Sequence, residues 1–224
     1  MIASGYMNTL FVLVVGVVIN LFMTILAAYF LSRKNKVFFK NIIMGVMMFT
    51  MYFSGGLIPG YILIQDLGLY DSLWALILPG AISAYNLIIM RTSFQAIPQS
   101  LEEAAYLDGA THWQIIWHVV LPLSKAIVAV MILYYGVSHW NAWFGASIYL
   151  QDRTKYPLQL VLKEILIQND MSNMTQGAST GESYSVGESI KYAVIVVSTL
   201  PILCIYPFLQ KYFVKGVMIG AVKG

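Results

Sequence analysis

Residues 8–32 read NTLFVLVVGVVINLFMTILAAYFLS and contain no Asp, Glu, Lys or Arg. About 20 predominantly apolar residues are enough for a helix to cross a bilayer, so this stretch predicts a transmembrane helix. It is too long for the apolar part of a secretory signal peptide, and no basic residue precedes it. The stretch therefore indicates a membrane protein built from helices.

The composition of the whole chain agrees with this interpretation. Of its 224 residues, 59% are hydrophobic and 10% are charged, whereas soluble domains average about 45–50% apolar and about 25% charged residues. This excludes a soluble globular domain and leaves no room for a large catalytic domain outside the membrane. The net charge of +3 is too small to suggest nucleic-acid binding, and the single Cys204 excludes a disulfide framework.

Four further charge-free stretches are long enough to cross the membrane, namely 41–64, 72–90, 126–150 and 192–210. We therefore predict an all-α, polytopic transmembrane helical bundle with five spans, forming a single domain over residues 1–224.

The basic residues orient the bundle, because Lys and Arg mark the cytoplasmic side most reliably in short loops. The loop after the first span is basic, whereas the next loop, 65–71, has two Asp and no Lys or Arg. Alternation then makes 98–122 and the tail 211–224 cytoplasmic and the loop 151–191 extracellular. Nine of the 13 basic residues face the cytoplasm in this arrangement: Arg33, Lys34, Lys36, Lys40, Arg91, Lys125, Lys211, Lys215 and Lys223.

This orientation leaves the N-terminus outside, although residues 1–9 contain nothing that would hold it there. Two alternatives follow. Either a preceding span is missing, or the chain is a genuine five-span protein that is oriented by the basic residues after its first span.

Two groups of residues are candidate linings for a solute path. Gly55, Gly56 and Pro59 interrupt the second span, and irregular backbone at membrane depth is tolerated where protein buries it or a water-filled cavity receives it. His139 and Asn141 lie among tryptophans near the end of the fourth span, a combination suited to stacking on a sugar. An ordinary kink and an interfacial aromatic belt are the alternatives. No metal site is expected, because no ligand set accompanies His139.

The segment 98–122 reads PQSLEEAAYLDGATHWQIIWHVVLP. Ser100 with Glu103, and Thr111 with Gln114, have the spacing of capping boxes and predict two short helices. Gly109 falls between them, where a glycine in the left-handed conformation turns the chain sharply. A DNA-binding helix-turn-helix is excluded, because residues 100–118 contain no Lys or Arg for phosphate contacts.

Six residues of this segment occur at a characteristic spacing: Glu103, Ala104, Ala105, Gly109, Leu121 and Pro122. In this they resemble the EAA loop of ABC-importer membrane subunits, in which Glu-Ala-Ala is followed by a glycine and then by Ile-x-Leu-Pro. Val119 takes the Ile position here, which is a conservative departure.

The wider chain is similar to the carbohydrate importers of the maltose type, particularly to permeases for complex oligosaccharides. The similar stretches are Asp108-Gly109-Ala110, residues 156–159 and the tail 211–224. The resemblance implies the type I ABC-importer permease fold. Family members usually have six spans and this chain begins at their second one, so the resemblance favours the missing-span alternative.

The resemblance implies a function for the chain: a membrane-spanning pore subunit of an ATP-driven importer for a carbohydrate, in which the EAA loop couples closure of the ATPases to alternating access. It implies partners as well. These would be a pair of cytoplasmic ABC ATPases, a second permease subunit, an extracellular solute-binding protein and the lipid of a bacterial inner membrane, with the C-terminus in the cytoplasm. The chain has no Gly-rich phosphate-binding loop, so ATP would be bound by the partner ATPase and the chain is not expected to be an enzyme or to carry catalytic residues. Glu103 would be the charged anchor for the ATPase, with Asp108 beside Gly109, which sets the angle between the two helices.

Two other functions remain open at this stage. The chain fits an importer subunit for a solute other than a sugar, because the EAA loop does not read the solute. It also fits a truncated fragment that does not transport.

Overall fold

The computed structural model describes residues 2–33, 39–175, 189 and 192–204. Every regular element in these ranges is a helix or a helical turn, which confirms the all-α fold. The elements are α1 (Ile2–Ser32), α2 (Lys40–Tyr52), α3 (Leu57–Asp66), η1 (Leu73–Leu76), η2 (Leu78–Gly80), α4 (Ala84–Gln95), α5 (Gln99–Leu107), α6 (His112–Ile115), η3 (Ile116–Val120), α7 (Leu121–Leu123), α8 (Lys125–Trp140), α9 (Phe144–Tyr149), η4 (Arg153–Lys155), α10 (Leu158–Thr175) and the helix Tyr192–Cys204.

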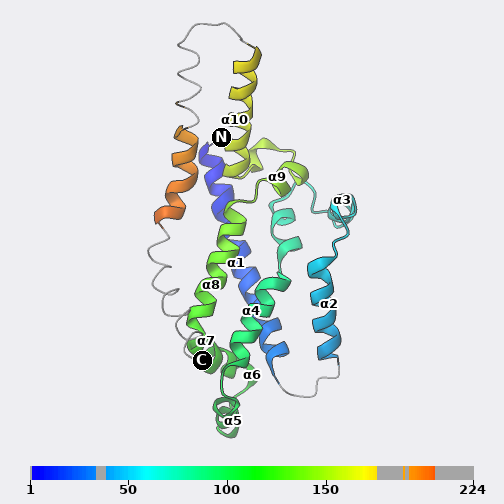
Figure 1. Ribbon diagram of the computed structural model, residues 1–224, viewed down its shortest axis with the longest axis vertical. Coiled ribbons are helices and arrows are strands. Elements are labelled where there is room, and N and C mark those ends of the chain that lie inside the picture. Colours follow the sequence, from blue (N-terminus) through cyan, green and yellow to red (C-terminus); the bar gives the residue numbers. More distant parts are fainter. Residues whose placement is uncertain (1, 34–38, 176–188, 190–191, 205–224) are drawn as a thin grey trace.

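Helix α1 is the centre of the bundle, with α4 and α8 packed against it (Figure 1). Helix α2 stands on one side of these three, and Tyr192–Cys204, in orange, stands on the other. Two side chains form hydrogen bonds to the backbone of Tyr192–Cys204. Tyr6 Oη donates to the carbonyl of Val197 (2.8 Å), and Trp140 Nε1 donates to the carbonyl of Ser198 (3.1 Å). The α5 and α6 region lies at one end of the bundle, and α10 extends beyond the other.

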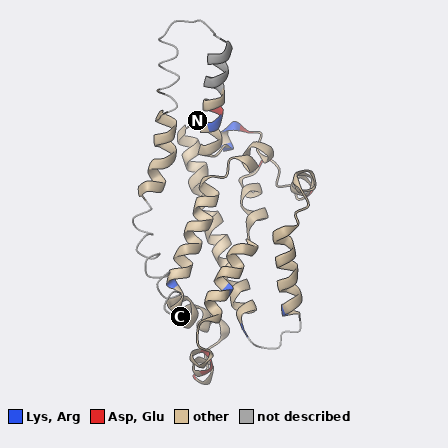
Figure 2. Ribbon diagram, viewed as in Figure 1, with Lys and Arg blue, Asp and Glu red and all other residues tan. Residues whose placement is uncertain are grey.

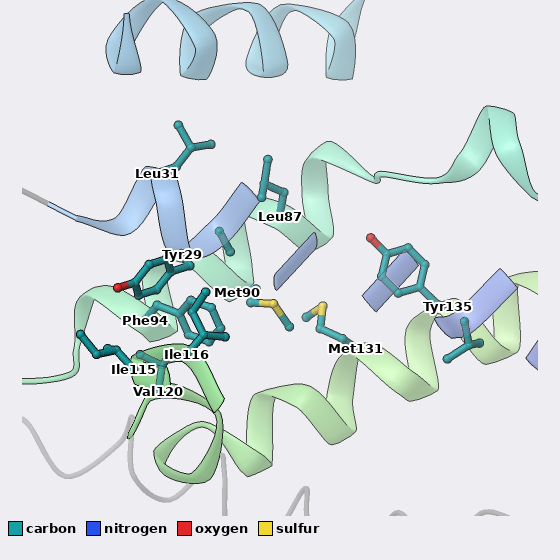
Figure 3. Close-up of a cluster of buried hydrophobic side chains, with 12 residues drawn as sticks. Tyr29, Leu31, Leu87, Met90, Phe94, Ile115, Ile116, Val120, Met131 and Tyr135 are labelled. Carbon is teal, nitrogen blue, oxygen red and sulfur yellow. The ribbon is translucent and has the colours of Figure 1, made fainter. Parts of the chain in front are cut away.

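The largest buried cluster joins the long helices to the α6 and η3 region. Figure 3 shows side chains from α1, α4, α6, η3 and α8 converging, among them Tyr29, Phe94, Ile115, Val120 and Met131. Phe94, Ile115, Val120 and Met131 are each 0% exposed. The segment between α5 and α8 is therefore packed into the core of the bundle and is more than a loose connector.

The charges lie near the two ends of the bundle, and the middle is almost free of them (Figure 2). Within the described part of the chain, α1 alone qualifies as a span by length and composition, and three bent pairs qualify when each pair counts as one. These pairs are Lys40–Tyr52 with Leu57–Asp66, Leu73–Gly80 with Ala84–Gln95, and His112–Leu123 with Lys125–Trp140. The fifth predicted span, 192–210, lies partly outside the described residues, so the count of five spans stays a prediction. The tail 211–224 lies wholly outside them.

Two of the predicted spans, 72–90 and 126–150, are not regular helices throughout. The stretch 72–90 begins as 3₁₀ turns, and its regular helix, α4, begins only after Ser83, whose side chain accepts from the backbone N–H of Asn86. The stretch 126–150 is helical only to Trp140, where α8 ends, and α9 then forms a separate short helix. Apolar composition alone does not register where the backbone leaves the helix.

Candidate coupling site

Helix α5 begins two residues earlier than its sequence suggested. Pro98, with φ −57° and ψ 129°, precedes the first helical residue, Gln99. Ser100 therefore lies inside the first turn, and no side chain caps the helix. The capping box predicted for Ser100 and Glu103 was wrong, and the Glu103 carboxylate is exposed at the surface instead.

Gly109 makes the turn that ends α5. Its φ of +80° lies in the left-handed region, which costs a residue with a Cβ about 1–2 kcal/mol. The N–H of Ala110 donates to the carbonyl of Ala105 (2.9 Å), and that of Gly109 donates to Tyr106 (3.0 Å). This pair of bonds is the Schellman motif, and it confirms the predicted glycine turn.

The capping box predicted at the start of α6 is confirmed. The Thr111 N–H donates to Gln114 Oε1 (2.7 Å), and the Gln114 N–H donates to Thr111 Oγ1 (3.4 Å). Two backbone donors that the helix start would leave unpaired are thus satisfied. The orientation of α6 relative to α5 is consequently fixed by Gly109 on one side and by Thr111 on the other.

The remainder of the segment is an irregular helix. Ile116–Val120 forms a π-helical turn, and Pro122 follows it in α7. Proline has no N–H to donate within a helix, and π turns commonly interrupt helices at functional positions. The next helix, α8, leaves this segment at an angle of 87°.

The predicted coupling residues occupy two faces. Ala105, Asp108 and Gly109 line a hollow of about 390 Å³ on the α5 and α6 side. Leu121 and Pro122 instead line an apolar groove of about 730 Å³ between α1 and α8. Glu103 and Ala104 are exposed on α5 and line neither.

The buried carboxylate of this region is Glu102, which the sequence analysis missed in favour of its neighbour Glu103. Glu102 is 4% exposed and forms an ion pair with Arg33, the residue that follows α1. The helical period was the available signal, because Glu102 lies three residues before Ala105 and therefore shares its inward face.

Comparison with known proteins identifies the family of this fold. Residues 21–219 match the model of the binding-protein-dependent transport system inner membrane component. The chain belongs to this family.

Relatives of this permease cover nearly all of its length. It is 45% identical to Protein LplC of Bacillus subtilis over 216 residues, which are 96% of this chain and 72% of that protein. It is also 45% identical to the polygalacturonan/rhamnogalacturonan transport system permease protein YtcP of the same organism over 228 residues, covering 100% of this chain and 78% of the relative.

A solved structure gives the same result. It is the crystal structure of a bacterial ABC transporter involved in the import of the acidic polysaccharide alginate. The match has a TM-score of 0.81 and 36% sequence identity, and it covers 94% of this chain and 74% of the other. The ABC-importer permease fold implied by the sequence resemblance is thereby confirmed.

Gly55, Gly56 and Pro59, the first group of candidate residues for the solute path, lie where the second predicted span is interrupted. Helices α2 and α3 meet at 117°, and Gly56 has a φ of +90° at this bend. Gly55, Gly56 and Pro59 are all exposed, and a Cβ added at Gly56 would meet no atom within 4 Å. The bend therefore lies in open space in the single chain.

The second group of candidate residues for the solute path is His139 and Asn141, and the two side chains make hydrogen bonds to different parts of the bundle. His139 is half-buried and turned toward α1, where its Nε2 lies 2.7 Å from Asn20 Oδ1. Asn141 is exposed, and its Nδ2 donates to the carbonyl of Val137 on its own helix (3.0 Å). His139 thus serves the packing of two helices, and its role in a solute path stays a prediction. Among the described residues, no group of three or more His, Cys, Asp or Glu side chains is placed to hold a metal ion.

Proposed function

We propose that this permease is a pore subunit of an ATP-driven importer for acidic oligosaccharides. The observation that carries the proposal is the Gly109 turn: it presents an exposed Glu103 on a short helix at one end of the bundle, while the following residues Ile115 and Val120 are buried in the bundle core. A displacement imposed on this segment from outside is therefore passed to the long helices.

The partners follow from this role. A pair of ATPases supplies the energy at the α5 end, a second permease subunit completes the pore, and an extracellular binding protein delivers the solute. The segment 98–122 is the coupling loop, the loop 151–191 faces outward, and the C-terminal tail lies in the cytoplasm. Glu103 is the charged contact with the ATPase, and Ala104, Asp108 and Gly109 shape the surface around it.

The choice of an acidic oligosaccharide rests on the relatives. YtcP carries polygalacturonan and rhamnogalacturonan in its name, and the matching solved transporter is involved in alginate import. The substrate preference can be tested by measuring the uptake of an oligogalacturonide and of a neutral malto-oligosaccharide by the same vesicles. Equal uptake of both would indicate a general carbohydrate importer. We expect the oligogalacturonide to be the preferred solute.

Assembly with the ATPase tests the coupling role. The tagged permease, expressed with its partner subunits, is purified as wild type, as Glu103→Gln and as Asp66→Asn, a control acid that is exposed near the opposite end. Glu103→Gln should recover less ATPase per permease, whereas Asp66→Asn should match the wild type. Equal recovery of ATPase with all three proteins would remove Glu103 from the interface.

A further inference from the structure

The end of α1 is a meeting point of three other helices. The Leu31 carbonyl accepts from Arg91 Nε of α4 (3.0 Å). The Arg33 carbonyl accepts from Lys40 Nζ at the start of α2, and the Arg33 guanidinium pairs with Glu102 of α5. Each contact uses the charged or polar end of a side chain, so the position of α1 is tied to α2, α4 and α5 within a few residues.

The ion pair with Glu102 is shielded from water. The side chains of Arg33 and Glu102 are only 14% and 6% exposed. Arg33 has no other carboxylate within ion-pair distance among the described residues. Removing either partner leaves a buried charge without compensation, so the two side chains hold each other in place.

Aromatic residues extend this contact to α6. The Arg33 Cζ lies 4.5 Å from the centre of the Tyr29 ring, a cation–π arrangement. Tyr29 Oη lies 3.4 Å from His112 Nδ1 of α6, and Tyr106 Oη of α5 lies 2.5 Å from the same nitrogen. The coupling helices, α5 and α6, are therefore both joined to the end of α1. Helix α5 is joined by the ion pair of Glu102, and α6 is joined through His112.

The ion pair is also the buried anchor of α5. Glu102 is the one buried residue of this helix, whose other side chains are exposed or half-buried. Helix α5 lies at the tip of the bundle (Figure 1). Glu102 and Arg33 therefore give a force applied to the exposed face of α5 a direct, buried route to the end of α1.

We propose that Arg33 and Glu102 are positioning residues that transmit the movement of α5 to α1, so that ATP hydrolysis moves the transmembrane helices. This inference rests on the proposed function as an ATP-driven importer. It separates two adjacent acids by role: Glu103 meets the motor, and Glu102 carries the motion into the bundle.

The test measures ATP hydrolysis and solute uptake in the same proteoliposomes, using the complete complex with Glu102→Gln, with Arg33→Gln or with both changes. The neutral double variant removes both charges, so it leaves no unpaired buried charge if a single variant fails to fold. Arg33→Lys, which keeps the cation, is the conservative variant, and Asp66→Asn, which changes an exposed acid near the opposite end of the bundle, is the control.

We expect the double variant to assemble with the ATPase and to hydrolyse ATP within about twofold of the wild type, while uptake per ATP falls about tenfold. Arg33→Lys should restore part of the uptake per ATP. Asp66→Asn should leave both the assembly with the ATPase and the uptake per ATP at the wild-type level.

Two results would overturn the inference. One is unchanged uptake per ATP in the double variant, and the other is a parallel loss of assembly, hydrolysis and uptake, which marks a merely structural pair. Wild-type vesicles distinguish these from failure of the proposed function: if wild-type complexes show no ATP-driven uptake, the proposed function fails, whereas wild-type uptake with unaltered variants defeats only the role of Arg33 and Glu102.

Discussion

Asn20 of α1 and His139 of α8 form a hydrogen bond of 2.7 Å inside the bundle. Asn20 is fully buried, and its Nδ2 donates to the carbonyl of Gly80 (2.6 Å). Because the Asn20 nitrogen donates to Gly80, the atom that faces His139 is the amide oxygen, which can only accept. His139 therefore donates from Nε2, which carries the proton. One asparagine thus joins α1 to α8 and satisfies a carbonyl of the 3₁₀ turn η2, where the third predicted span is irregular.

Replacing Asn20 with Leu should destabilise the permease by about 1–3 kcal/mol, because Asn20 is fully buried and its loss leaves the half-buried His139 without its partner. Thermal unfolding in detergent measures the loss. Asn141→Leu is the control, since this amide is exposed and bonds only its own helix; its change should stay within about 0.5 kcal/mol. Equal effects of the two substitutions would contradict the importance of the Asn20 contact.

Gly16→Ala tests the same contact from a position four residues earlier on α1. A Cβ at Gly16 would lie 2.6 Å from His139 Nε2, so the ring must move away from Asn20. Alanine is otherwise favoured over glycine within a helix by about 0.5–1 kcal/mol. We expect Gly16→Ala to lower the unfolding temperature. Gly136→Ala in α8, where a Cβ meets nothing within 4 Å, should leave that temperature unchanged or raise it, and a rise for both variants would refute the prediction.

Gly109→Val should abolish transport while the permease still enters the membrane. The left-handed turn at φ +80° disfavours valine by about 1–2 kcal/mol, so the angle between α5 and α6 changes. Gly68→Val is the matched control, because Gly68 has a φ of +67° at the end of α3, far along the chain from the coupling helices. Uptake should be lost in the first variant and largely kept in the second. Wild-type uptake with Gly109→Val would rule out the proposed role of this turn.

Acid should loosen the contact between the loops at the predicted extracellular end. Asp71 Oδ1 accepts from the backbone N–H groups of Gln151 and Asp152 (2.9 and 3.0 Å), and Oδ2 lies 2.7 Å from Lys155 Nζ. The hydrogen bond from Lys155, followed by those from Asp152 and Gln151, lowers the pKa of Asp71 from 3.8 to about 2.

Since the pKa of Asp71 is lower in the folded protein, its contribution is complete above about pH 4 and is lost as the pH falls toward about 2. Asp71→Asn keeps the left-handed backbone (φ 54°) accessible but removes the charge. The gap in unfolding temperature between wild type and Asp71→Asn should therefore narrow as the pH is lowered from 6 to 3. A gap that is constant over this range would show that the ionised carboxylate contributes nothing.

Most features that local sequence determines were predicted, although the capping box at Ser100 and Glu103 was not formed. A charge-free run located α1, a glycine between two helix signals located the Gly109 turn, and Thr111 with Gln114 located the start of α6. Each depends on residues that are close together in the chain, where helix geometry and capping chemistry leave few alternatives.

The features that depend on distant residues were not predicted. Asn20 and His139 are 119 positions apart, and Asp71 and Lys155 are 84 apart, so no local pattern connects them. Glu102 was missed for a related reason: its role depends on Arg33 lying beside it in space, whereas its sequence neighbour Glu103 carries the recognisable motif. The end of α8 at Trp140 also escaped, because apolar residues continue beyond it.

Concentrative uptake of an oligogalacturonide by proteoliposomes that contain the complete complex decides whether the permease is the pore of an ATP-driven importer. With binding protein on the outward side and ATP on the side that carries α5, we expect accumulation above the external concentration, and no accumulation when ATP is omitted or when the permease carries Gly109→Val. Equal accumulation with and without ATP, or wild-type accumulation by the Gly109→Val complex, would contradict this function.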